Sequence, residues 1–287
     1  MRLPTRLLRR DLKSHKGDFG HVFVLAGSLN FTGAAALAAG AAMRSGAGLV
    51  TIGIPEGLSG ALIKIKPLEV MIKPFPQTPK LALSASAYKP VKEFLDKADV
   101  LLIGPGLSQD KPVQGLIRRL IKPAGRPMVI DADGLNALAG HLDVLRAGRH
   151  TPRAMVITPH PGEMARLLGV SVKKVQGNRE TIAKKFALDY NLTVVLKGHN
   201  TVIAGSKGEL FINKTGNPGM ASAGTGDVLA GMIAAFLGQG LGAFEAGKFA
   251  VYLHGIAGDL AAGEKTQLGL VASDIIAKIP EAIKKCS

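Results

Sequence analysis

Short runs of apolar residues alternate with longer helical patterns along almost the whole chain, and this alternation constrains the fold more than any other feature. Each run is short, and most are followed by glycine or proline, as buried strands are. Strands that alternate with helices form βαβ units, whose strands lie parallel. The sequence therefore predicts an α/β protein with a mostly parallel sheet. The expected strands are 21–26, 49–55, 100–104, 128–131, 155–158, 193–197, 201–204 and 210–212.

The last three expected strands lie too close together in sequence for helices to connect them. We therefore expect them to form antiparallel hairpins at one edge of the sheet. Three prolines over 74–79 predict a rigid loop there. The expected helices are 32–45, 111–121, 162–168, 173–190, 225–237, 243–262 and 271–284.

With 287 residues, of which 47% are hydrophobic, the chain is near the upper size for one domain. We expect a basic N-terminal arm over 1–15 and a single domain over 16–287. The longest uncharged run, 228–244, is close to the roughly 20 residues of a membrane helix, but its glycines indicate a buried helix and turn instead. The single cysteine, Cys286, excludes an internal disulfide. We expect a cytoplasmic homo-oligomer with no membrane segment.

The net charge of +15 raises nucleic-acid binding as a possible function. Beyond the arm, however, the positive charges are spread along the chain. The sequence has no tryptophan and only three tyrosines that could stack on bases. We therefore expect no nucleic-acid partner and interpret the excess charge as a solvated surface that favours anionic ligands.

The strongest local chemical signal is the glycine-rich segment 217–227, which continues directly into an apolar helical pattern. Gly224, Thr225 and Gly226 leave backbone N–H groups free where the helix dipole is positive, so they are predicted to form an anion hole. Asp227 has two interpretations. It is either a helix cap that contributes about 1 kcal/mol or a general base that takes the proton of a substrate hydroxyl. The tetrapeptide alone favours neither.

Three further glycine turns follow expected strands, at 26–28, 104–106 and 131–134. Ligands of open α/β sheets bind beyond the carboxyl ends of the strands, where all these turns lie. The turns therefore predict one shared cleft at this edge of the sheet.

Another strand end carries His160 and Glu163. Glu163 is a candidate ligand for magnesium through water, because Mg²⁺ at phosphates keeps several waters and takes one or two carboxylates. Its alternative role is that of a first-turn acid, which the helix dipole favours. His160 is a candidate contact for a polar substrate group or a hydrogen-bonded turn residue. Taken alone, both residues favour the structural interpretation.

The hairpin over 194–203 presents five consecutive residues with a lysine and with amide and hydroxyl donors: Lys197, Gly198, His199, Asn200 and Thr201. Such a turn can enclose a nucleotide phosphate or ribose. An ordinary polar turn explains the isolated pattern better. The chain has no GxxxxGK[ST] phosphate loop, GxSxG elbow or HExxH zinc motif, so any phosphate chemistry is of another type.

Taken together, the ordered segments resemble the NAD(P)H-hydrate dehydratase family, a branch of the ribokinase-like superfamily. The resemblance covers nearly the whole chain, and several motifs in order are more specific than any single one. The matching segments are KGDFGHVFVLAGS at 16–28, TGAAALAAGAAMRSGAGLVTIG at 32–53, IGPGL at 103–107, IDADGLNAL at 130–138, ITPHPGEMARLLG at 157–169, VVLKGHNTVIA at 194–204, GNPGMASAGTGDVLAGMIAAFL at 216–237 and VYLHGIAGD at 251–259.

The resemblance implies a three-layer α/β/α fold and two groups of ligand-binding residues. The residues that it places on ADP or ATP are Lys197, Gly198, His199, Asn200, Thr201 and Gly226. Those that it places on the hydrated nicotinamide cofactor are Ala35, Gly106, His160 and Asp227. His199 departs from the family, which often has a small residue there, so its contact with the nucleotide is the least secure.

The implied reaction is the dehydration of the S epimer of NAD(P)H hydrate, which regenerates NAD(P)H. Asp227 deprotonates the ring hydroxyl, the nucleotide transfers its terminal phosphoryl group to it, and phosphate then leaves. Mg²⁺ is the expected cofactor, and ADP is favoured over ATP as the donor. The family often carries an epimerase domain in front of this one, so an epimerase is an expected functional partner, and both a stand-alone enzyme and part of a fusion stay open.

Two alternatives remain at this point, because fold does not fix function. The nearest is a kinase of a small alcohol, such as hydroxyethylthiazole, a pyrimidine alcohol or a sugar, which would use the same base and release a stable phosphate ester. The other is a module that binds nucleotide or nucleic acid without catalysis.

Overall fold

A single nine-stranded sheet organises the computed structural model, which describes residues 1–122, 125–146 and 154–287. The strand order is β3-β2-β1-β4-β5-β6-β7-β8-β9, parallel from β3 to β7 and antiparallel at β8 and β9. The expected hairpins at one edge are therefore confirmed. The strands are β1 (His21–Leu25), β2 (Leu49–Pro55), β3 (Met71–Phe75), β4 (Val100–Ile103), β5 (Met128–Ile130), β6 (Met155–Ile157), β7 (Thr193–Leu196), β8 (Val202–Ala204) and β9 (Leu210–Ile212).

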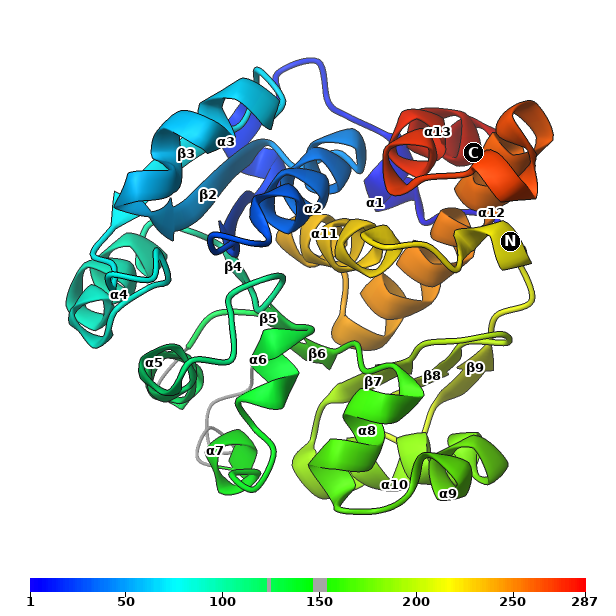
Figure 1. Ribbon diagram of the computed structural model, residues 1–287. Coiled ribbons are helices and arrows are strands. Elements are labelled where there is room, and N and C mark those ends of the chain that lie inside the picture. The colour runs from blue at the N-terminus through cyan, green and yellow to red at the C-terminus, as the bar shows by residue number, and fades with distance from the viewer. Residues whose placement is uncertain (123–124, 147–153) are drawn as a thin grey trace.

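Helices cover both faces of the sheet and complete three layers (Figure 1). Alternate residues of β1 show why: Val22 and Val24 belong to one apolar core, and Phe23 and Leu25 belong to the other. One layer contains α2 (Thr32–Arg44), α3 (Ser59–Ile65), α11 (Thr225–Gly238), α12 (Ala243–Gly269) and α13 (Ala272–Lys285). The opposite layer contains α4 (Tyr88–Leu95), α5 (Lys111–Ile121), α6 (Asp133–Asn136), α7 (Asp143–Arg146), α8 (Pro161–Leu168), α9 (Val172–Gly177) and α10 (Arg179–Tyr190).

The small residues of α2 and α11 serve helix packing. A Cβ placed on Gly231 of α11 would come within 2.1 Å of the carbonyl oxygen of Ala38 in α2. The two helices therefore touch through their backbones, which only a glycine permits at that point. This contact fixes where the first turn of α11 lies relative to the sheet.

Three local expectations were wrong. Pro74 belongs to β3 and not to a loop. Proline is tolerated there because β3 is the edge strand and pairs only with β2. The expected helix over 173–190 is two helices, because Asn178 between them has the non-helical angles φ −139° and ψ 36°. The helix expected over 243–262 continues to Gly269, with a break at Thr266.

The first residues of the chain pack against its last helix. Leu3 is buried, and its N–H donates to the carbonyl of Cys286 at 2.9 Å. Arg6 in α1 (Thr5–Leu8) donates to the carbonyl of Gln239 at 2.6 Å. The division into an arm over 1–15 and a domain over 16–287 stays a prediction. Within the described residues, no helix is both long enough and apolar enough to cross a membrane.

Candidate active site

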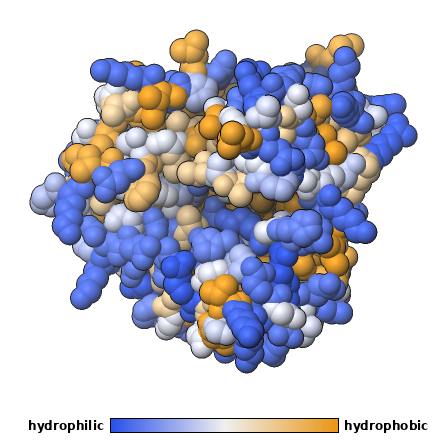
Figure 2. Space-filling view, turned by 45° about the vertical axis from the view of Figure 1, so that its right-hand side comes forward, coloured by the Kyte–Doolittle hydropathy of each residue, from blue (hydrophilic) through white to orange (hydrophobic). Residues whose placement is uncertain are grey.

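The carboxyl ends of three neighbouring parallel strands bring polar side chains together. Asp131 follows β5, Thr158 follows β6 and Lys197 follows β7. Backbone hydrogen bonds hold the strand ends in line: the N–H of Asp131 donates to Ile103, and that of Lys197 donates to Pro159 at 2.8 Å. The glycine turns predicted one shared cleft along this edge, and this stays a prediction; the space-filling view shows a hollow across the middle of one face (Figure 2).

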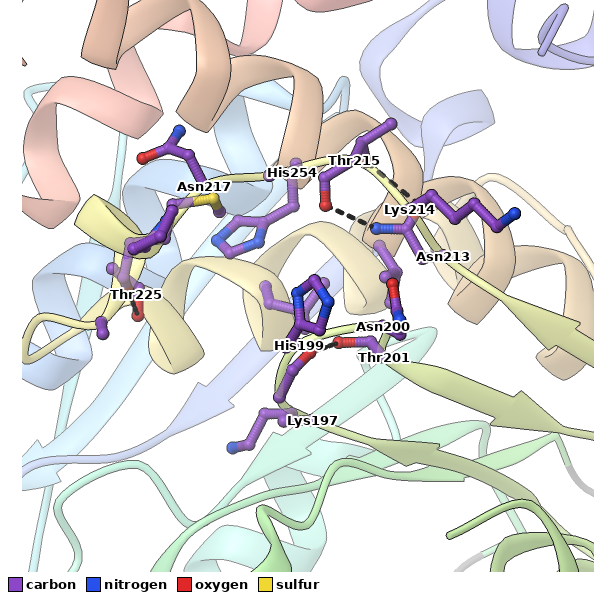
Figure 3. A pocket seen from close by; sticks show the side chains of 18 of the residues that line it. Lys197, His199, Asn200, Thr201, Asn213, Lys214, Thr215, Asn217, Thr225 and His254 are labelled. Atoms are coloured by element: carbon purple, nitrogen blue, oxygen red, sulfur yellow. Dashed lines mark hydrogen bonds between the residues drawn. The ribbon is translucent and has the colours of Figure 1, made fainter. Parts of the chain in front are cut away.

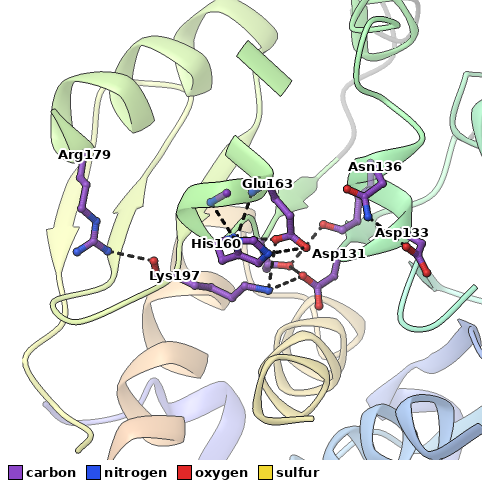
Figure 4. A network of polar contacts seen from close by, with 10 residues as sticks. Asp131, Asp133, Asn136, His160, Glu163, Arg179 and Lys197 are labelled. Atoms are coloured by element: carbon purple, nitrogen blue, oxygen red, sulfur yellow. Dashed lines mark hydrogen bonds and ion pairs between the residues drawn. The ribbon is translucent and has the colours of Figure 1, made fainter. Parts of the chain in front are cut away.

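Lys197 and Asp131 form an ion pair at the centre of this edge. Lys197 Nζ lies 2.7 Å from Asp131 Oδ1, which also accepts a 2.7 Å hydrogen bond from Thr158. Asp131 is only 1% exposed. Burial alone would lower the pKa of Lys197, but the charges of Asp131 and Glu163 outweigh it and raise that pKa. The lysine is therefore held charged and in one position (Figure 4).

His160 and Glu163 form the N-terminal cap of α8. His160 Nδ1 accepts the N–H groups of Gly162 and Glu163, and Glu163 Oε2 accepts the N–H of His160 at 2.8 Å. Both residues thus have the structural role that the sequence offered as the alternative. Because Nδ1 acts as an acceptor, the proton of a neutral His160 is on Nε2, where the half-exposed ring can donate it. Burial and then Lys197 lower the pKa of His160, which favours this neutral form.

Glu163 also lies within the reach of Lys197. Its Oε2 is 3.9 Å from Lys197 Nζ, and its side chain is 6% exposed. Burial raises the pKa of Glu163, while Lys197 opposes that shift. The charge of Glu163 in turn helps to raise the pKa of Lys197.

Asp227 occupies the first turn of α11, as the glycine-rich segment predicted. Burial, followed by the negative charge of Asp131, raises the pKa of Asp227 to about 7, although Lys197 acts in the opposite direction. A carboxylate with a pKa near the working pH is suited to accept and return a proton. The structure gives no hydrogen bond from the Asp227 side chain to a backbone N–H among the described residues, so the capping interpretation has no support here.

The residues before Asp227 allow α11 to begin close to the ion pair. Gly224 has φ +88°, a left-handed conformation that glycine adopts without strain. A Cβ on Gly226 would lie 3.3 Å from Lys197 Nζ and 4.0 Å from Asp131 Oδ2. The positive end of the helix dipole and Lys197 are therefore side by side, as an anion hole requires.

A second group of turns lies further along the same sheet edge. Ser28 donates to the carbonyl of Gly106 at 2.8 Å, and a Cβ on Gly106 would meet Phe31 at the start of α2. This brings the loops after β1 and β4 together, as expected. Ala35 has no exposed surface and packs beside Gly27. The assigned cofactor contacts of Ala35 and Gly106 stay predictions.

A pocket of about 530 Å³ opens on the other side of Lys197 (Figure 3). Its volume suits a ligand of nucleotide size. All six residues that the sequence assigned to the nucleotide line it. They are Lys197, Gly198, His199, Asn200, Thr201 and Gly226.

The opposite wall of the pocket is the loop between β9 and α11, which residues of α12 hold in place. Asp259 accepts the N–H of Gly216 and the side-chain amide of Asn217, both at 3.0 Å. Thr215 donates to the carbonyl of Tyr252 at 3.0 Å. The pocket therefore lies between a hairpin turn and a loop tied to α12.

Sequence reasoning missed several residues of this site. Asp131 and Thr158 belong to segments that were noted for other features, and their roles depend on strands that are neighbours only in space. His254 of α12 lines the pocket, is buried, and has its pKa lowered to about 4, mainly by burial. An acid directly after an apolar strand was the available signal for Asp131. No local sequence pattern distinguishes Thr158 or His254 from ordinary structural residues.

No cluster of three His, Cys, Asp or Glu side chains that could hold a metal ion occurs among the described residues. The carboxylates near the predicted anion hole are those of Asp131, Glu163 and Asp227. They suit a cation whose remaining ligands are water and phosphate oxygens.

Comparisons with known proteins place the site in context. The family model of NAD(P)H-hydrate dehydratase matches residues 22–281. A bifunctional NAD(P)H-hydrate repair enzyme of Moorella thermoacetica is 47% identical over 98% of this chain and 52% of its own length. An ADP-dependent (S)-NAD(P)H-hydrate dehydratase of Neisseria meningitidis is 34% identical over 99% of this chain and 90% of its own length. The chain thus spans about half the length of the bifunctional relatives.

A solved structure agrees with the observed architecture. The crystal structure of an ADP/ATP-dependent NAD(P)H-hydrate dehydratase from Bacillus subtilis, co-crystallised with ATP and Mg²⁺, superposes with a TM-score of 0.81 at 33% identity. The match covers 100% of this chain and 95% of the other. The ribokinase-like α/β/α fold that the sequence predicted is confirmed. With the model match over most of its length, the chain belongs to the NAD(P)H-hydrate dehydratase family.

Proposed function

We propose that this chain catalyses the nucleotide-dependent dehydration of (S)-NAD(P)H hydrate to NAD(P)H. One observation carries the proposal: Asp227, with a pKa raised to about 7, stands in the first turn of α11 beside Lys197, which borders a nucleotide-sized pocket. A base of suitable pKa, an anion hole and a donor pocket therefore adjoin. This is the set of groups that phosphoryl transfer to a hydroxyl requires.

In the proposed reaction, Asp227 takes the proton of the ring hydroxyl as the oxygen attacks the terminal phosphorus of the nucleotide. The bond between that phosphorus and its bridging oxygen breaks, and the shortened nucleotide is released. The anion hole and Lys197 stabilise the charge on the transferring group. Phosphate then leaves the ring carbon, the neighbouring carbon loses a proton, and the double bond of the dihydronicotinamide returns. Phosphate is a better leaving group than hydroxide, which explains a kinase fold in a dehydratase.

Two groups of contacts complete the proposal. The pocket residues from Lys197 to Thr201 and Gly226 bind the nucleotide. His160, whose Nε2 lies 3.6 Å from Glu163 Oε1, is proposed to contact a polar group of the cofactor. Ala35 and Gly106 are proposed to line the cofactor side. The phosphoryl donor is ADP in preference to ATP, because the near full-length relatives are named as ADP-dependent.

Magnesium fits this site only with water and phosphate oxygens as most of its ligands. Glu163 would hold it through water, and when bound it would neutralise phosphate charge. We also propose a homo-oligomer, a cytoplasmic location, which the single buried Cys286 suits, and a functional partnership with an epimerase, which the bifunctional relatives suggest.

The test is an assay of the purified protein with NADPH hydrate, magnesium and either ADP or ATP. Recovery of dihydronicotinamide absorbance that depends on the nucleotide is expected, and faster recovery with ADP would identify the donor. A folded sample that recovers no absorbance with either nucleotide would contradict the proposal. A lasting phosphorylated alcohol from a screen of small alcohols would then favour the kinase alternative.

A further inference from the structure

Arg179 holds the hairpin turn that forms one wall of the pocket. It is the first residue of α10, and its guanidinium reaches three carbonyl oxygens of the β7–β8 turn. Nη2 donates to Leu196 at 3.0 Å and to Lys197 at 3.2 Å, and Nη1 donates to His199. Figure 4 shows Arg179 on the side of the turn opposite to the Lys197 ammonium group. No other side chain among the described residues makes as many contacts with this turn.

The turn has positive φ angles at two residues whose types tolerate them. Gly198 has φ +132° and Asn200 has φ +52°, both in the region that most residues avoid. A Cβ on Gly198 would also lie 3.3 Å from Arg179 Nη2. Gly198 and Asn200 let the chain reverse here, and the guanidinium fixes the turn by binding its carbonyl oxygens.

The orientation of the peptide groups has a direct consequence for the pocket. In a trans peptide, the C=O of one residue and the N–H of the next point in opposite directions, and the described chain has no cis bonds. The carbonyls of Lys197 and His199 face Arg179, so the N–H groups of Gly198 and Asn200 face away from it. Both residues line the pocket, which Arg179 does not. Within residues 1–122, 125–146 and 154–287, neither N–H has a protein acceptor.

We propose that Arg179 is a positioning residue that sets these two N–H groups as a binding site for a nucleotide phosphate. Adjacent free N–H groups in a turn form a concave anion site. The charge of Arg179 behind the turn adds to the attraction, and its planar fork fixes three carbonyls in a way that a lysine ammonium does not. The inference rests on the proposed function for the identity of the ligand. It concerns how tightly the phosphates bind and not the chemical step.

The test compares Arg179→Lys, which keeps the charge but not the fork, with Lys185→Gln as a matched control. Lys185 lies on the same helix, and its exposed ammonium group forms an ion pair with Asp189 at 3.1 Å instead of binding the turn. Calorimetric titration with ADP and with adenosine separates phosphate binding from base and ribose binding. We expect Arg179→Lys to weaken ADP binding about tenfold or more and adenosine binding less than threefold. The KM for the nucleotide should rise while kcat changes less than threefold.

Unchanged ADP affinity in Arg179→Lys would overturn the inference, as would equal losses for ADP and adenosine. A urea unfolding midpoint checks that the variant is folded. If Arg179→Lys does not fold, Gly198→Ala is a second variant that changes the same turn. If the parent protein binds no nucleotide, the proposed function fails together with the inference. If the parent binds and turns over but Arg179→Lys matches it, only the inference fails.

Discussion

On one side of the first turn of α11 lie three carboxylates, those of Asp131, Glu163 and Asp227, and on the other lies a pocket lined mainly by backbone and neutral side chains. On the acidic side, Asp131 and Glu163 are buried, and burial raises the pKa of Glu163 and of Asp227. In the pocket, the donors are N–H groups, hydroxyls and amides. Lys197 borders both regions. Under the proposed function, the carboxylates that take part in proton transfer are thus kept apart from the groups that bind the nucleotide.

The difference follows from how each side is built. The acidic side depends on ends of parallel strands that are buried and fixed by ladder hydrogen bonds. The pocket depends on two loops whose positions are held by single residues behind them, Arg179 and Asp259. Changes on the acidic side should therefore alter the chemical step, and changes around the pocket should alter nucleotide binding.

The largest expected effect is that of Asp227→Asn, which removes the base and keeps the shape. We expect kcat to fall by about 10²-fold or more, as for loss of a general base, while ADP affinity stays within threefold. Steady-state kinetics and calorimetry measure the two quantities. Asp274→Asn is the matched control, because Asp274 is a first-turn acid of α13 that accepts the N–H of Val271 at 3.0 Å. If Asp227→Asn retained the parent kcat, the separation into two sides would be wrong.

Lys197→Met should affect both sides at once. Loss of a charge-assisted contact to phosphate predicts a fall in kcat/KM of about 10- to 100-fold. The substitution also leaves buried Asp131 without its partner, which costs about 3 kcal/mol of unfolding free energy. Urea unfolding and kinetics measure the two losses.

Adding Asp131→Asn to Lys197→Met removes the unpaired charge but not the acceptor for Thr158. We expect the double variant to recover most of the stability and none of the activity. Recovery of activity together with stability would show that Lys197 acts on the fold alone.

The sequence predicted one whole wall of the pocket, and on the acidic side it predicted Glu163 and Asp227 but not Asp131. The turn from Lys197 to Thr201 is contiguous, so one segment contains its residues, and all of them line the pocket. Asp131 was missed because its pairing with Lys197 spans 66 positions and depends on the order of β5, β6 and β7. Strand order is decided by packing over the whole sheet, which no single segment records. The edge strand β3 was missed for a local reason: Pro74 lies within it and Pro76 follows it, and prolines are typical of loops.

The pH dependence of the parent enzyme offers a less drastic test of the acidic side. The raised pKa of Asp227 means that its carboxylate form, which is the proposed base, dominates only above about pH 7. We expect kcat/KM to fall roughly tenfold for each pH unit well below 7. The affinity for ADP should show no comparable fall over this pH range. Because Lys197 lowers the pKa of Asp227, the acid limb of Lys197→Met should move to higher pH. A limb near pH 4 in the parent would contradict the assignment of Asp227.

The smallest expected effect belongs to the far wall of the pocket. Asp259→Ala removes the acceptor of the Gly216 N–H and the Asn217 amide, which frees the loop without touching the acidic side. Because Asp259 is exposed, water replaces much of each lost bond, and we expect the nucleotide KM to rise only about threefold with kcat unchanged. Glu264→Ala, further along α12, is the control, since its partner Lys278 lies on α13. A fall in kcat with an unchanged KM would mean that this loop also positions the reacting groups, and the two sides would then form one cooperative unit.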